Sequence, residues 1–243
     1  MSIDTHRIEN SLLAALPEPQ LARLGHHLEL VSMPLGRVLY EPDTPQAYVY
    51  FPADCIVSLA YMMEDGHSAE IAAVGHEGMV GVQLYMGGES VPNRAQVRSA
   101  GSAYRLGSAI LREEFGTSRE LQNLLLRYAL ALFNQTALTA VCNRLHTVDQ
   151  LLCRSLLFTL DCLGGSELKM TQELMAGMIG VRREGITEAA GKLQAAGIIS
   201  YRRGSISILS RQRLEKRCCE CYRVIKREFM RLLPHAAPLA RAA

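Results

Sequence analysis

The residues with the clearest chemical potential are an arginine and a glutamate at positions 183 and 184. They open a segment in which Ile186, Ala190 and Leu193 recur at helical spacing, so the two polar side chains lie away from the apolar stripe. Arginine can donate two hydrogen bonds to guanine, and glutamate can accept one from cytosine. The phosphates of DNA repel an acidic side chain, so such a side chain is favourable on a DNA-facing surface only where it accepts a hydrogen bond from a base. The pair therefore indicates a helix that reads base edges.

A second short helix is expected directly before this one. Thr171 stands at an N-cap position, with Gln172 and Glu173 in the first turn, where polar and acidic side chains are favoured. Gly180 supplies the turn between the helices, and Gly197 ends the second. Two short helices joined by a glycine-containing turn predict a helix-turn-helix.

A basic hairpin follows the second helix. Residues 198–201 and 205–208 alternate like strands around Arg202-Arg203-Gly204, and a basic hairpin tip suits contact with DNA phosphates. The alternative is a small helical domain with an incidental hairpin. The predicted DNA-binding residues are Thr171, Gln172, Arg182, Arg183, Glu184, Thr187, Glu188, Arg202 and Arg203.

Charge is distributed unevenly along the 243 residues, although the net charge is only +2. Residues 1–165 carry 11 Arg, no Lys and 17 Asp plus Glu, whereas residues 166–243 carry 15 Lys plus Arg and 7 Glu. This asymmetry suggests two domains, of which the basic one faces an anionic partner. The alternative is that the excess of basic residues in the second part forms a surface that is exposed only to solvent.

The first half of the chain has the texture of a small β-domain. A helical entry over residues 11–30 precedes short apolar segments at 37–40, 47–51, 56–61 and 68–74, which glycine and proline separate. Asp65-Gly66 between two of these segments predicts a hairpin. Many short strands at this spacing are typical of a barrel or jelly roll.

Glycine and proline are absent between residues 118 and 163, where a long helical pattern is expected to break near His146-Thr147 and to end at Gly164-Gly165. One face repeats with a period near 3.5, which favours a two-stranded dimer interface. Packing on the chain's own domain would give the same spacing. The predicted dimerisation residues are Leu124, Tyr128, Ala131, Gln135, Leu138, Cys142 and Leu145.

These segments predict an α+β fold: an N-terminal β-roll or jelly-roll sensor domain (1–117), a long dimerisation helix (118–146) and a C-terminal winged helix-turn-helix (147–233). The motifs Thr171-Gln172-Glu173 and Gly180-Val181-Arg182-Arg183-Glu184, with residues 193–199, resemble the helix-turn-helix of Crp/Fnr transcription regulators. The order of the elements also resembles that family.

The resemblance implies a homodimer on a palindromic DNA site, with Arg183 and Glu184 reading bases and a ligand or redox event acting on the sensor. Two positions depart from the family pattern. Arg182 stands where the family often has serine, so a helix cap is lost. Glu188 stands where a base-reading arginine is common, so the preferred half-site is expected to differ from those of well-known members.

The cyclic-nucleotide cassette of the family is only partly matched. Gly75 to Gly81 and Asn93 to Val97 give the nearest alignment, in which Asn93 occupies the position of the phosphate-binding arginine. Arg94 is one residue further, and neighbouring residues of a strand point to opposite sides. Gly78, Gly81 and Arg94 are the candidate ligand residues. A cyclic nucleotide or dinucleotide is a conceivable ligand, but the sequence requires none, and turn or packing roles explain the glycines equally well.

Seven cysteines form an odd set without the pattern of a disulfide framework, which favours reduced thiols. Cys218, Cys219 and Cys221 lie close together between Arg217 and Arg223, so reactive thiolates are conceivable. Without a clear fourth ligand, and with all three expected on one helix, we predict a buried or incidental role and no metal. Metal or redox sensing remains the alternative, and the histidines show no ligand spacing.

No nucleophile–base arrangement, phosphate loop or carboxylate pair indicates an enzyme. The N-terminus lacks the pattern of a secretory signal and no uncharged apolar run is long enough to span a membrane, so we expect a cytoplasmic protein that does not contact membranes. The expected partners are double-stranded DNA, a second copy of the chain and RNA polymerase. The alternative function is a cyclic-nucleotide or cyclic-dinucleotide receptor that acts through protein partners.

Overall fold

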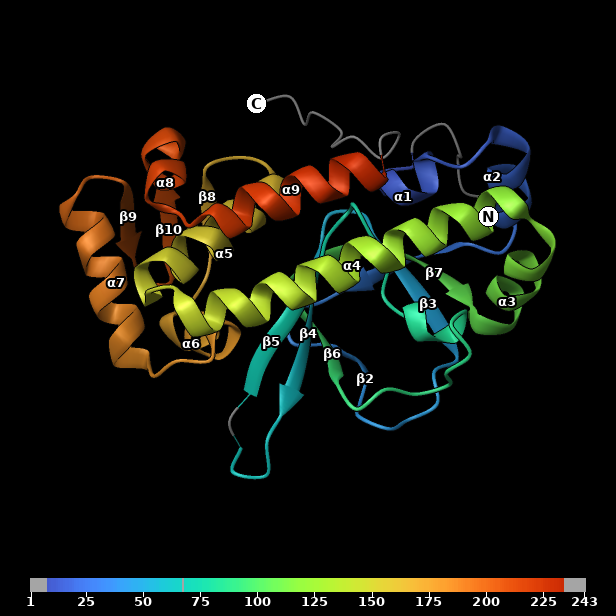
Figure 1. Cartoon of the computed structure of the whole chain (residues 1–243), viewed down its shortest axis with the longest axis horizontal. Helices are drawn as coiled ribbons and strands as arrows, with labels where there is room; N and C mark the ends of the chain where they lie inside the picture. Colours follow the sequence, from blue (N-terminus) through green and yellow to red (C-terminus); the bar gives the residue numbers. More distant parts are fainter. Residues whose placement is uncertain (1–7, 67, 234–243) are drawn as a thin grey trace.

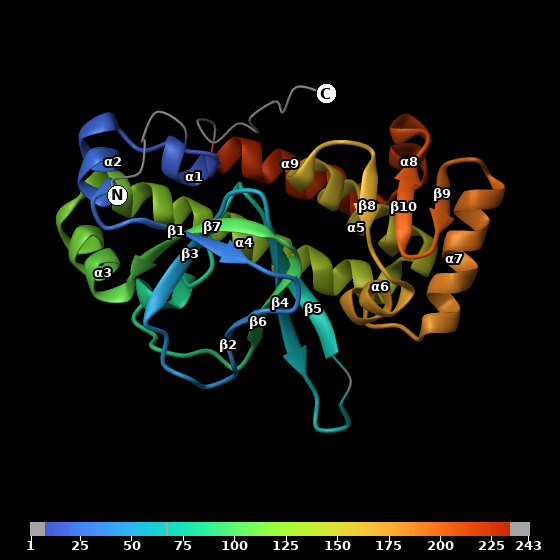
Figure 2. The same cartoon turned by 180° about the vertical axis from the view of Figure 1, so that it is seen from behind.

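The N-terminal half of the molecule is a β-roll built from two antiparallel sheets (Figure 1, Figure 2). The computed structural model describes residues 8–66 and 68–233. One sheet has the order β1-β7-β3 and the other the order β2-β6-β4-β5. Their bounds are β1 (Glu29–Met33), β2 (Val38–Tyr40), β3 (Tyr48–Pro52), β4 (Ile56–Met62), β5 (Ser68–Val74), β6 (Arg94–Ser99) and β7 (Gly101–Gly107).

The predicted strands and the hairpin between β4 and β5 are confirmed, but the helical entry was predicted too long. It consists of two helices, α1 (Ser11–Ala14) and α2 (Glu18–Gly25). Pro17 and Pro19 explain the division, because proline lacks the backbone N–H that a helix interior needs. Glu29 and Leu30 already belong to β1, where they pair with β7.

Helices α3 (Ser108–Thr117) and α4 (Arg119–Leu145) follow the last strand of the β-roll, which also contains the short helix η2 (Val82–Leu84). The 27-residue α4 runs along the molecule (Figure 1). The predicted break after α4 is confirmed. His146 is its C-cap, and Thr147 starts α5 (Val148–Leu163) with a capping box to Gln150. The predicted end of α5 at Gly164-Gly165 is also confirmed, since both glycines have positive φ.

The face of α4 that we predicted to form the dimer interface packs mainly within the chain. Tyr128, Ala131, Gln135 and Cys142 are all buried. The Tyr128 hydroxyl donates to the Met79 carbonyl at 2.8 Å, and Gln135 Nε2 donates to the Ala73 carbonyl at 3.1 Å. These side chains are therefore unavailable to a second chain in this structure, and the alternative of packing on the chain's own domain holds for them.

A different face of α4 is both apolar and exposed. Large side chains at Leu126, Leu130, Phe133 and Val141 are 46 to 68% exposed and lie on one face of the helix. Because α4 is apolar on both faces, an 18-residue window reaches a mean hydropathy of 1.3, enough by composition to span a membrane. A third of that window is buried inside the molecule, and core helices of soluble proteins can reach the same length and mean hydropathy.

The C-terminal half has its own apolar core around a three-stranded sheet of order β8-β10-β9. Strand β8 was not predicted from the sequence, because it has three residues and only Leu168 among them is buried. The elements are β8 (Glu167–Lys169), α6 (Gln172–Ile179), α7 (Arg183–Ala195), β9 (Ile199–Arg202), β10 (Ser205–Ile208), α8 (Arg211–Arg217) and α9 (Glu220–Leu232).

The last helix links the two halves. In both views α9 lies beside α4 and runs back, antiparallel to it, toward the β-roll (Figure 1, Figure 2). Its first turn contributes Cys221 and Tyr222 to the C-terminal core, whereas Leu232 and Leu233 join the core of the β-roll. The segment from 147 to 233 is therefore not separated from the β-roll by a simple linker.

Candidate nucleic-acid interface

Helices α6 and α7 form a helix-turn-helix with the predicted caps. The Thr171 hydroxyl accepts a hydrogen bond from the Leu174 N–H at 3.1 Å, which stabilises the start of α6. Gly180 ends α6 in the left-handed conformation, with φ of 74°, that glycine adopts without a steric penalty. The apolar face of α7 (Ile186, Ala189, Ala190 and Leu193) is buried as predicted.

The opposite face of α7 exposes the predicted base-reading residues Arg183, Glu184 and Thr187. Gln172 on α6 links two of them, because its Oε1 accepts from Arg183 Nε at 3.4 Å and lies 3.2 Å from the Thr187 hydroxyl. The same hydroxyl lies 3.0 Å from the Arg183 carbonyl oxygen. The first turn of α7 is thus connected to the start of α6.

Glu188 lies on the same exposed face but has a cation of its own. Its carboxylate is 2.8 Å from Lys192 Nζ, one helical turn further along. This hydrogen bond and the adjacent positive charge lower the pKa of Glu188. Lys192 Nζ also lies 3.8 Å from Asp149 of α5, so the pair connects the exposed face of α7 with α5. Lys192 was not predicted from the sequence as the partner of Glu188.

Arg182 confirms the predicted loss of a helix cap. It is the N-cap residue of α7 and makes no side-chain capping hydrogen bond. No N-cap side chain therefore bonds the first N–H groups of α7, and the start of a helix attracts anions.

The predicted wing is a tight hairpin with a basic tip. Arg202 pairs with Ser205, and the two residues between them have positive φ, 49° at Arg203 and 79° at Gly204. This is the type I′ geometry that suits a two-residue hairpin turn. Lys169 pairs with Ser205 from the other side, so the exposed end of β8 adds a third cation. Lys169 could have been assigned to the wing from the sequence only if strand β8 had been predicted.

The exposed cations of α7 and the wing are not neutralised by neighbours. Within residues 8–66 and 68–233, no carboxylate lies within 4.0 Å of the side-chain nitrogens of Arg182, Arg183, Arg202 or Arg203. Charges that remain unpaired in this way are available to an anionic partner.

The three candidate ligand residues have other contacts in the structure. A Cβ atom on Gly78 would lie 2.4 Å from the Tyr128 hydroxyl oxygen, and one on Gly81 would lie 2.8 Å from a Val49 methyl group. Arg94 Nε and Nη2 donate to the Glu41 carboxylate at 2.7 and 2.8 Å. The two glycines thus have close packing contacts, and Arg94 is paired with a carboxylate.

Comparison with known proteins decides the nature of the C-terminal domain. Residues 150–217 match the family model described as the Crp-like helix-turn-helix domain. This segment is a Crp-like helix-turn-helix domain. It includes α6, α7 and the wing, and it ends before α9. No curated protein matches the chain.

The Crp-like domain and the β-roll occur together in similar solved structures. FixK2 from Bradyrhizobium japonicum has a TM-score of 0.69 at 18% identity over 79% of this chain and 98% of its own. A putative regulator of the crp/fnr family from Eubacterium rectale scores 0.66 at 18% identity over 83% and 94%. The c-di-GMP responsive regulator CLP from Xanthomonas campestris scores 0.65 at 17% identity over 80% and 100%. The expected α+β fold, with its Crp/Fnr-like arrangement, is confirmed.

Proposed function

We propose that this protein is a homodimeric transcription regulator of the Crp/Fnr type that binds a palindromic DNA site. The observation that carries the proposal is the Crp-like domain with Arg183 and Glu184 exposed at the start of α7, beside a basic hairpin. A recognition helix contacts base edges with the residues near its N-terminus. Arg183, Glu184 and Thr187 occupy those positions, with Gln172 restricting two of the side chains.

The hairpin would supply affinity rather than sequence preference. Arg202, Arg203 and Lys169 lie at its exposed end, where they can contact phosphates on either side of the groove occupied by α7. Phosphate contacts fix the position of a protein on DNA but carry no direct sequence information. Base readout by α7 and backbone contact by the wing are therefore separable in experiments.

The exposed stripe of α4 supports the dimer. Leu126, Leu130, Phe133 and Val141 are spaced by four, three and eight residues, which places them on one face of α4, as in the seam of a two-stranded coiled coil. At a rise of about 1.5 Å per residue, this part of α4 is more than about 20 Å long. An exposed apolar surface of this length is unusual for a monomer and favours a protein partner. We place the dimer interface here rather than on the face predicted from sequence.

Within this proposal the partners are double-stranded DNA, a second copy of the chain and RNA polymerase, and the protein acts in the cytoplasm without enzymatic activity. A cyclic nucleotide at Gly78, Gly81 and Arg94 is not part of the proposal, because these residues contact Tyr128, Val49 and Glu41 instead.

The test is selection of bound duplexes from a random DNA library by the full-length protein. We expect enrichment of an inverted repeat whose half-sites are centred about 10 base pairs apart, one turn of DNA. The Glu184→Gln variant should enrich a half-site that differs at one position. Recovery of no consensus, or of an unpaired half-site by a monomer, would contradict the proposal.

A further inference from the structure

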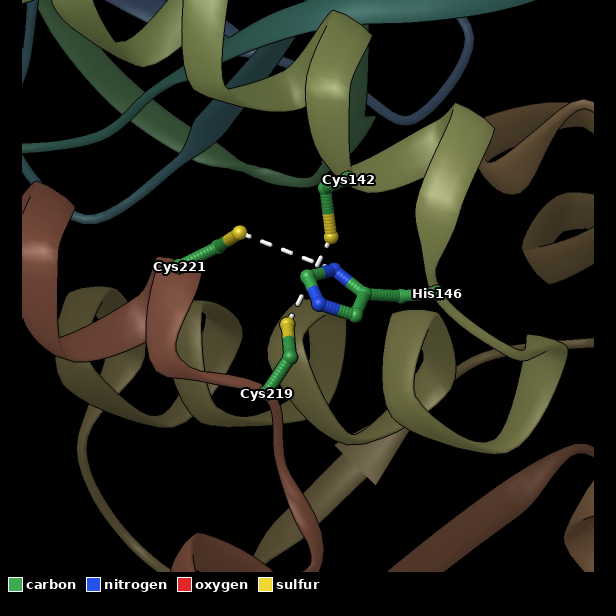
Figure 3. A group of neighbouring side chains, drawn as sticks. All are labelled: Cys142, His146, Cys219 and Cys221. Carbon is green, nitrogen blue, oxygen red and sulfur yellow. Dashed lines mark hydrogen bonds between the residues drawn. The ribbon is translucent and has the colours of Figure 1, made fainter.

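Four potential metal ligands converge where α4 ends and α9 begins. Cys142 and His146 lie one helical turn apart at the end of α4, and Cys219 and Cys221 lie at the start of α9. Figure 3 shows the three sulfur atoms and the imidazole ring directed toward a common centre. One ligand atom from each residue lies within 4.8 Å of every other.

The distances fit a single ion in tetrahedral coordination. A zinc–sulfur bond of about 2.3 Å places the sulfurs of a tetrahedral site about 3.8 Å apart. Cys142 Sγ lies 3.5 Å from Cys219 Sγ, and Cys221 Sγ lies 3.7 Å from His146 Nδ1. In an iron–sulfur cluster of four irons, each cysteine binds a different iron, which holds the ligand sulfurs further apart. The close approach of these donors therefore favours a mononuclear site.

The surroundings are those of a closed site. The three cysteines are buried, at most 3% exposed, and the side chain of His146 is 15% exposed. Its second nitrogen, Nε2, lies 3.5 Å from a carboxylate oxygen of Glu220. A carboxylate on the far nitrogen of a histidine ligand fixes its orientation and makes the near nitrogen a better donor.

We propose that Cys142, His146, Cys219 and Cys221 bind one Zn²⁺ ion per chain. A Cys₃His set with no open position is typical of a structural zinc site. The ion would join the end of α4, at the elbow that leads into α5, to the start of α9. This inference is independent of the proposed DNA binding.

No metal was predicted from the sequence, and the structure shows why. Cys218, Cys219 and Cys221 were expected on one helix, but Cys218 and Cys219 have extended backbone conformations between α8 and α9. The remaining two ligands come from α4, 73 or more residues earlier in the chain. A Cys142–Cys219 disulfide is the rival interpretation, because the two sulfurs are 3.5 Å apart. A disulfide would leave Cys221 and His146 without a role.

The test is titration of the reduced, metal-free full-length protein with Co²⁺. We expect the visible ligand-field bands of tetrahedral cobalt and a near-ultraviolet thiolate charge-transfer band, both saturating at one equivalent and both lost when Zn²⁺ is added. X-ray absorption of the zinc-loaded protein should show three sulfurs and one nitrogen. Octahedral spectra, no saturation, or zinc shells made of oxygen would overturn the proposal.

Single substitutions distinguish the proposed metal ligands from the neighbouring Cys218. Cys219→Ser suits the fold, because Cys219 is the N-cap of α9 and serine is favoured there. It and His146→Ala should weaken Co²⁺ binding more than about 100-fold. Cys218→Ser is the matched control, since Cys218 lies beside the set but outside it, and should keep the spectrum. Equal loss in all three variants, or a Cys142–Cys219 disulfide in protein purified from zinc-supplied cells under reducing conditions, would contradict the assignment.

Discussion

Single residues in this molecule often have a role that depends on one contact from a distant part of the chain. Gly78 is an example, because the sequence alone left a ligand role and a packing role equally open. The structure places it under Tyr128, which is buried and donates to the Met79 carbonyl. A glycine is needed here because the aromatic ring leaves no space for a Cβ atom.

Gly78→Ala should therefore destabilise the protein by about 1–3 kcal/mol, the usual cost of overpacking a core. Gly116→Ala is the matched control, because Gly116 lies in α3 with nothing within 4 Å of its Cβ position. Alanine there should be neutral or stabilise by up to about 1 kcal/mol. Urea unfolding of both variants measures the difference, and equal stabilities would show that Tyr128 does not restrict Gly78.

Glu220 offers a second test at this scale, aimed at the metal site. Glu220→Gln removes the negative charge near His146 Nε2 but keeps the shape of the side chain. The loss of an orienting carboxylate should weaken metal affinity by about tenfold, the lower end of its usual effect, because Glu220 is largely exposed. Competition with a zinc chelator gives the affinity. Unchanged affinity would mean that His146 is held by other contacts.

At the scale of elements, the periodicity of α4 shows how far sequence reasoning reaches. The 3.5-residue repeat correctly indicated a long helix with an apolar face, but α4 has two such faces. Only the docking of Tyr128 and Gln135 on the β-roll shows which face is internal. The caps, the turn at Gly180 and the basic hairpin depend on local sequence, and they were predicted correctly.

Phe133→Asp should dissociate the proposed dimer, because it places a charge in the exposed stripe of α4, where Phe133 is 68% exposed. Met230→Asp is the control, since Met230 is 51% exposed on α9 and lines a cavity with His76 and Phe158 rather than with residues of that stripe. Sedimentation velocity reports the oligomeric state of each variant. A Phe133→Asp protein that remains dimeric at micromolar concentration would move the interface to another surface.

A buried ion pair within the β-roll also contacts α5. Arg98 of β6 donates to both carboxylate oxygens of Glu70 at 2.8 and 3.0 Å, and to the Thr159 hydroxyl of α5 at 3.1 Å. The Arg98 side chain is 4% exposed. Removing one partner of such a pair leaves an uncompensated buried charge.

Arg98→Met should consequently destabilise the protein by about 3–5 kcal/mol. Arg94→Met provides the control on the same strand, because Arg94 forms a similar two-point pair with Glu41 that is open to solvent. Its loss should cost less than about 1 kcal/mol. Thermal unfolding compares the two, and similar melting temperatures would argue against a structural role for the buried pair.

At the scale of the whole molecule, the Crp-like domain is attached to the β-roll by more than the α4–α5 elbow. Helix α9 returns along α4 and places Leu232 and Leu233 in the core of the β-roll. The Cys₃His set lies at one end of this helix pair, and the apolar contact with the β-roll lies at the other. Sequence could not predict this arrangement, because α4 and α9 are separated by the entire helix-turn-helix domain.

The central claim is that Arg183 reads a base whereas Arg203 contacts the DNA backbone. The most direct measurement is the affinity of Arg183→Ala and Arg203→Ala for the selected site and for unrelated DNA at several salt concentrations. Arg183→Ala should lose about 1–3 kcal/mol on the selected site alone, with relaxed preference at one base pair per half-site. Arg203→Ala should weaken both DNAs alike and lower the slope of log affinity against log salt by about one. If both variants lose only sequence-independent affinity, the assignment of Arg183 is contradicted.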